Sequence, residues 1–82
     1  MIDFEEGKHI ASDFLKCDEQ RILMKIYDAG SEWIVFSGIP GTVQVGGQGA
    51  LVNKDDGSVR AFRLPSEENF KKLKAAKLIY EV

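Results

Sequence analysis

The sequence has few of the residues on which catalytic and metal sites usually depend. It contains one cysteine, Cys17, and one histidine, His9, in 82 residues. A single cysteine cannot form an intramolecular disulfide bond, which fits a reducing cytoplasm. His9 lies two helical turns before Cys17, too far for a hydrogen-bonded pair of nucleophile and base. We therefore expect no enzyme active site, and neither a metal site nor another cofactor.

Long apolar runs and an excess of basic charge are also absent. The longest strongly apolar run, Trp33 to Phe36, is far too short to cross a membrane. The first residues, MIDFEEGK, are acidic where a signal peptide would be basic. The net charge is −2, without the basic stripe that a nucleic-acid-binding protein normally shows. We therefore expect a cytoplasmic protein with neither a membrane nor a nucleic acid as partner.

The charge that is present is divided unevenly along the chain. Residues 1–41 carry eight acidic and four basic side chains, whereas residues 42–82 carry five acidic and seven basic ones. Many of the bases fall on one expected helix near the C-terminus, where they complement the helix dipole. The acidic N-terminal half could instead steer a basic partner towards the protein by complementary charge.

The hydrophobic pattern predicts one α+β domain over residues 1–82. We expect an N-terminal helix over 2–16, four strands, a second helix ending near residue 76 and a possible fifth, edge strand over 78–82. The four strands are predicted over 20–28, 32–37, 49–53 and 58–64. Strands that follow one another in sequence favour an antiparallel sheet, and we expect both helices on one face of it.

Three features of this pattern make more specific predictions. Residues 32–37 are apolar in both alternating sets, which indicates a central strand. In the first strand, Ile22, Met24 and Ile26 should point to one face, with Leu23, Lys25 and Tyr27 on the other. Gly7 falls near the apolar face of the first helix, so we expect close packing against it.

Residues 38–49 hold five of the eight glycines. Gly46, Gly47 and Gln48 reproduce the tripeptide that class-I translation release factors use, but a motif of three residues counts only in the right structural context. No Gly-Lys-Ser or Gly-Lys-Thr follows the glycines, so a phosphate-binding loop is excluded. We interpret the segment as an adaptable bend between the second and third strands.

The central region resembles a family of known proteins. Trp33 and Phe36 lie in an apolar strand, and after the glycine-rich segment Val52, Lys54, Gly57 and Val59 occupy a strand and a tight turn. This order resembles the YrhB-like immunity proteins of bacterial polymorphic-toxin systems over about residues 32–64. Two positions of the turn differ from the family pattern, Asn53 for Asp and Asp56 for Thr. The resemblance implies an α+β protein without an active site that binds and neutralises a cognate toxin.

We therefore predict a small non-enzymatic binding protein whose partner is another protein, such as a toxin. The expected contact residues lie around the first hairpin and in the glycine-rich segment: Tyr27, Asp28, Glu32, Gly46, Gly47 and Gln48. The alternative is a structural module that forms a homodimer through the edge strand at 78–82. A small enzyme using Cys17 or Gln48 is a third possibility, with less support.

Overall fold

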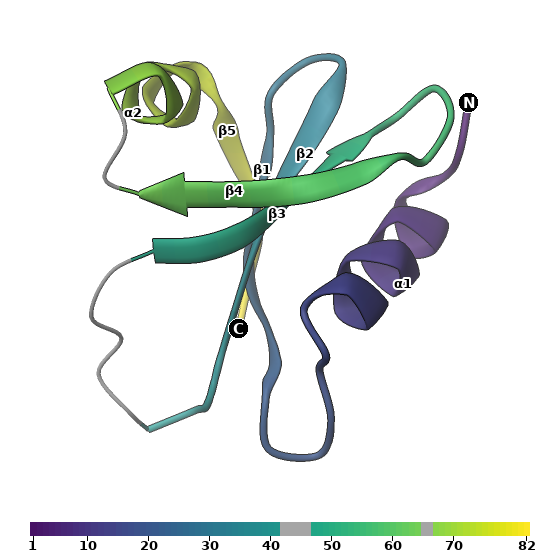
Figure 1. Ribbon diagram of the computed structural model, residues 1–82, viewed down its shortest axis with the longest axis vertical. Coiled ribbons are helices and arrows are strands. Elements are labelled where there is room, and N and C mark those ends of the chain that lie inside the picture. The colour runs from purple at the N-terminus through teal and green to yellow at the C-terminus, as the bar shows by residue number, and fades with distance from the viewer. Residues whose placement is uncertain (42–46, 65–66) are drawn as a thin grey trace.

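The computed structural model of the protein describes residues 1–41, 47–64 and 67–82 (Figure 1). The elements are α1 (Phe4–Phe14), β1 (Ile22–Asp28), β2 (Glu32–Gly38), β3 (Gly47–Asn53), β4 (Val59–Leu64), α2 (Glu67–Ala75) and β5 (Lys77–Glu81). The five strands form one sheet in the order β4-β3-β2-β1-β5, and all neighbouring strands are antiparallel. The α+β prediction and the fifth strand at an edge are therefore confirmed.

The central place of β2 follows from its sequence. Trp33 and Val35 point into a core on one face of the sheet, and Ile34 points into a second core on the other face. A strand that is apolar on both faces has to be covered on both sides. The prediction of a central strand is therefore confirmed.

The two helices lie on opposite faces of the sheet, so the prediction of both helices on one face is wrong. Ala11 of α1 belongs to the core around Trp33 and Val35, whereas Leu73 of α2 packs against Ile34 on the other face. Figure 1 shows α1 and α2 on the two sides of the strands. The physical reason is again β2, because one layer of helices would leave one of its apolar faces in water.

The position of α1 is set by its N-terminal cap and by a close contact with the sheet. The Asp3 carboxylate accepts a hydrogen bond of 2.8 Å from the backbone N–H of Glu6, as an N-cap residue does. Gly7 is buried, and a Cβ added to it would lie 2.5 Å from the Trp33 ring. The expected close packing of Gly7 is therefore confirmed. After α1 the chain turns at Lys16, which has a φ of 57°.

A β-bulge changes which side chains of β1 point to each face of the sheet. The register with β2 shifts between Leu23 and Lys25, so that Met24 is the additional residue. Leu23 then joins Ile26 in the core beneath α1, whereas Tyr27 belongs to the other core. The predicted strict alternation, with Leu23 and Ile26 on different faces, is wrong, because a bulge inserts one residue into the period of two.

Candidate functional site

Asp28, one of the predicted contact residues, connects the turn after β1 to the turn after β3. Its Oδ1 atom accepts hydrogen bonds of 2.8 Å from the Lys54 Nζ atom and of 2.8 Å from the Gly30 backbone N–H. The Lys54 Nζ atom also lies 5.3 Å from the centre of the Trp33 ring. Lys54 and then Gly30 lower the pKa of the Asp28 carboxyl, because both bind its charged form.

Glu32 serves a similar purpose on the other face of the sheet. Its side chain is 17% exposed, and its Oε1 atom lies 2.7 Å from the Lys72 Nζ atom of α2. The Arg60 guanidinium of β4 lies 3.6 Å from the second carboxylate oxygen. The ion pairs join β2 to α2 and β4, so Glu32 is committed to the fold.

Tyr27 is half-buried, and its ring meets the edge of Phe36 at a centroid distance of 6.0 Å. The structure therefore places Tyr27, Asp28 and Glu32 near the same turn but gives each of them intramolecular partners. Gly46 lies outside the described residues. Gly47 and Gln48 belong to β3, opposite Leu64 and Arg63 of β4, so the predicted bend does not include them.

Acid should destabilise the protein through three aspartates. Backbone N–H groups of Arg21 and Gln20 lower the pKa of Asp18, and hydrogen bonds from Ser58 lower that of Asp56, as Lys54 does for Asp28. The folded pKa values thus lie below the ordinary 3.8. The unfolded chain then binds more protons, and stability present above that value is lost as the pH falls through the folded pKa values.

Urea unfolding measured between pH 7 and pH 3 checks this expectation. The free energy of unfolding should be flat near neutrality and fall below a pH of about 4. A variant with Asp18→Asn, Asp28→Asn and Asp56→Asn should show a shallower fall. An equally steep fall in the variant would assign the acid sensitivity to other groups.

The outer surface of α1 and the turn after it hold carboxylates that the predictions missed. Glu6, Asp13 and Glu19 are exposed, and none of them forms a salt bridge within the described part of the chain. We call these three residues the α1 acidic surface. The uneven division of charge along the sequence was a signal for this surface. The sequence alone, however, did not distinguish these three carboxylates from Asp28 and Glu32 of the first hairpin.

The edge at β5 combines apolar and protective features. Leu78 and Ile79 are each 42% exposed. The register with β1, however, shifts between Ile26 and Tyr27, so β5 carries a bulge, and Lys77 and Glu81 occupy its two ends. Bulges and charged residues are the means by which natural edge strands avoid pairing with other chains. The homodimer through 78–82 stays a prediction.

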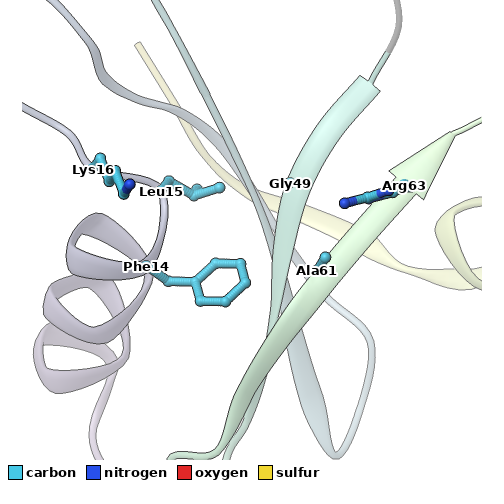
Figure 2. A pocket seen from close by; sticks show the side chains of 6 residues that line it. All are labelled: Phe14, Leu15, Lys16, Gly49, Ala61 and Arg63. Carbon is cyan, nitrogen blue, oxygen red and sulfur yellow. The ribbon is translucent and has the colours of Figure 1, made fainter.

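A pocket of about 220 Å³ lies between the end of α1 and the strands β3 and β4. It is lined by Phe14, Leu15, Lys16, Gly49, Ala61 and Arg63. Figure 2 shows Phe14 and Leu15 pointing from α1 towards the two strands, with Arg63 on the far side. Its walls combine apolar side chains with two cations and no carboxylate, so the pocket is suited to an apolar group that has an acidic neighbour.

The sole cysteine and the sole histidine differ in their exposure. Cys17 is half-buried and His9 is exposed on α1. Within residues 1–41, 47–64 and 67–82, no three His, Cys, Asp or Glu side chains converge as metal ligands would. None of the helices in that part of the chain has the length and apolar character needed to cross a membrane.

Comparisons with known proteins give no relative from which a function could be transferred. No protein-family model matches the chain, and neither a curated protein nor a solved structure shows significant similarity to it. A functional assignment therefore depends on the residue pattern of the chain and on the chemistry of its described surfaces.

Proposed function

We propose that the protein is a non-enzymatic, cytoplasmic binding domain of the toxin-neutralising immunity type, which covers a basic surface of a partner protein. Two observations support this. The sequence pattern over residues 32–64 resembles that of the YrhB-like immunity proteins, and the α1 acidic surface offers exposed negative charge on α1 and on the turn after it. Such proteins need a surface of the right shape and charge, and no reactive group.

The observation that carries the proposal is the contrast between two sets of carboxylates. Asp28 and Glu32 are held by lysine and arginine side chains of the same molecule. Glu6, Asp13 and Glu19 are exposed and without such partners among the described residues. Unpaired surface charge acts over about a Debye length of 8 Å at physiological salt and accelerates the encounter with an oppositely charged partner.

The α1 helix is a suitable support for such a surface because its position is fixed. Ala11 is fully buried in the core, and Gly7 lets the helix approach the Trp33 ring closely. Charges on a helix that is anchored in this way stay in register with a partner without the entropy cost of ordering a loop. The proposed contact surface is therefore α1 and not the first hairpin.

Co-expression with a toxic protein encoded beside its gene tests the proposal. Cells that carry the wild-type chain should grow, because the toxin is covered. The triple variant Glu6→Lys, Asp13→Lys and Glu19→Lys should fail to protect them. The matched control is Glu67→Lys with Glu68→Lys, which reverses two exposed acids in the first turn of α2 and should protect as the wild type does.

The possible outcomes separate the function from the surface. Cells that die equally fast with and without the wild-type chain would contradict the immunity function. Protection by both variants would keep the function but exclude the α1 acidic surface. In a binding assay with the purified toxin, the affinity of the wild type should fall as salt is raised from 50 to 500 mM, on the order of tenfold.

A further inference from the structure

The other edge of the sheet, β4, differs from β5 in having no bulge. It pairs with β3 in an unbroken register of six residue pairs, from Gly47 opposite Leu64 to Val52 opposite Val59. No bulge interrupts it, and β4 ends the strand order. A regular, unpaired edge of this kind is a template for an additional strand.

The hydrogen bonds around β4 show which backbone groups face outwards. Asn53 N–H donates to Ser58 O at 2.8 Å, a bond that flanks the pair of Val52 and Val59. In an antiparallel ladder, such flanking bonds mark a pair whose own N–H and C=O groups point away from the partner strand. Since these groups alternate along the strand, those of Val59, Ala61 and Arg63 face away from β3.

A contact at the end of β4 agrees with this assignment. The Asn69 Nδ2 atom of α2 donates a hydrogen bond of 2.8 Å to the Arg63 carbonyl, which is therefore not used by β3. The groups left without a described partner are the N–H and C=O of Val59 and Ala61 and the N–H of Arg63. An added strand would find three donors and two acceptors in a row.

The charge of β4 selects the kind of strand that would be added. Its side chains include two exposed arginines, Arg60 and Arg63, and no acid. A second copy of the chain would bring four arginines into one short interface. The only carboxylate described beside them is that of Glu32 on β2, which lies 3.6 Å from Arg60 in each copy. A strand with acidic side chains meets complementary charge instead.

The pocket of Figure 2 adds a position for an apolar side chain. Ala61 and Arg63 line it, so it opens beside the outer edge of β4 and on the face of the sheet that carries α1. A residue paired with Ala61 would direct its side chain to the same face, because directly opposite residues in a sheet share a face. Phe14 and Leu15 form the apolar wall.

We propose that the free edge of β4 binds an extended acidic segment of another protein, which adds to the sheet as a sixth, antiparallel strand. Two acidic residues three positions apart lie opposite Arg63 and Arg60, and the apolar residue opposite Ala61 enters the pocket. This surface lies on a different element from the α1 acidic surface and does not depend on the immunity function.

A synthetic peptide with the sequence Thr-Glu-Val-Leu-Glu-Val-Thr tests the proposal, because its leucine falls opposite Ala61 when its glutamates face the arginines. Titration into the ¹⁵N-labelled protein should shift the amide signals of Val59, Ala61 and Arg63 and leave those of β5 unchanged. The same peptide with lysine in place of both glutamates should bind at least about tenfold more weakly.

Two variants make the test specific for strand addition and for charge. Ala61→Pro removes an outward N–H at an edge, where proline is tolerated, and should abolish binding. Ala61→Val keeps the N–H and should bind. Arg60→Glu with Arg63→Glu should exchange the preference, so that the lysine peptide binds better than the glutamate peptide by about tenfold.

Three results would overturn the proposal. The first is binding that does not respond to the charge of the peptide or of the variant. The second is undiminished binding to a folded Ala61→Pro variant. The third is protection of the Val59 and Ala61 amides from exchange in the absence of peptide in a dimeric protein, which would assign the edge to a second copy. If the Ala61→Pro variant does not fold, the test depends on whether the variant with Arg60→Glu and Arg63→Glu prefers the lysine peptide to the glutamate peptide.

Discussion

Phe62→Ala should lower the free energy of unfolding by about 3–5 kcal/mol, the usual cost of removing a buried phenylalanine ring. Phe62 is 1% exposed and belongs to the small core on the α2 face, with Ile34 and Leu51. Its ring meets the edge of Phe36 at a centroid distance of 5.8 Å. A domain of this size has a total stability of roughly 5–10 kcal/mol, so the variant should be close to unfolding at 37 °C.

Phe70→Ala is the matched control, because the same atoms are removed from a ring on α2 that is 48% exposed. We expect it to cost less than about 0.5 kcal/mol. Thermal unfolding followed by circular dichroism distinguishes the two, since each kcal/mol corresponds to a shift of about 4–8 °C in Tm for a domain of this length. Equal shifts in the two variants would show that the α2 face has no tight core.

Gly7→Val should destabilise the protein by about 2–3 kcal/mol, although valine is a better helix former than glycine. A Cβ at this position would lie 2.5 Å from Cζ3 and 2.7 Å from Cε3 of Trp33. The indole ring is rigid and 8% exposed, so it can move only by disturbing Val35 and the neighbouring core. The expected cost is therefore that of overpacking, which exceeds the gain in helix propensity of roughly 0.5 kcal/mol.

His9→Val is the control for this variant, because it introduces the same residue at an exposed position of α1. Histidine and valine have similar helix propensities, so the change should be within about 0.5 kcal/mol. A double-mutant cycle with Trp33→Phe assigns the cost to the ring, and the two substitutions together should cost less than the sum of the single changes. Additive costs would place the strain elsewhere.

The sequence was sufficient for the fold wherever the local pattern and the packing require the same arrangement. The apolar run in β2 predicted its central position, and Gly7 on an apolar helix face predicted a close contact. Both follow from burial, which acts in the same way whatever the distant partner is. The element order and the fifth strand followed from hydrophobic periodicity and turn residues.

The errors arise where the fold depends on long-range pairing. The bulge at Met24 leaves no local signal, because it is fixed by the register with β2. The expectation of both helices on one face assumed a single layer of helices. The two apolar faces of β2 already required a covering layer on each side of the sheet. The start of β3 was misplaced because glycine is depleted in strands, and here its pairing with β4 overrides that preference.

The candidate site was harder to predict than the fold. Asp28 and Glu32 look available in the sequence, but their partners Lys54 and Lys72 lie 26 and 40 residues away along the chain. Only the folded structure shows that these charges are already paired, whereas Glu6, Asp13 and Glu19 have no salt-bridge partner in the described part of the chain. The free edge of β4 was likewise not visible, because edge and interior strands are distinguished by topology.

The strand order also has a consequence for folding. β1, β2, β3 and β4 pair with sequence neighbours, whereas β5 closes the longest loop, since Tyr27 pairs with Leu78. The entropy of closing that loop makes β5 the first strand expected to detach in partial unfolding. Its departure would uncover the apolar sequence Ile-Leu-Met-Lys-Ile-Tyr of β1 along a bare edge. While β5 stays paired, it therefore protects the edge of β1 from aggregation, and the solubility of the domain should depend on the strand that we expect to detach first.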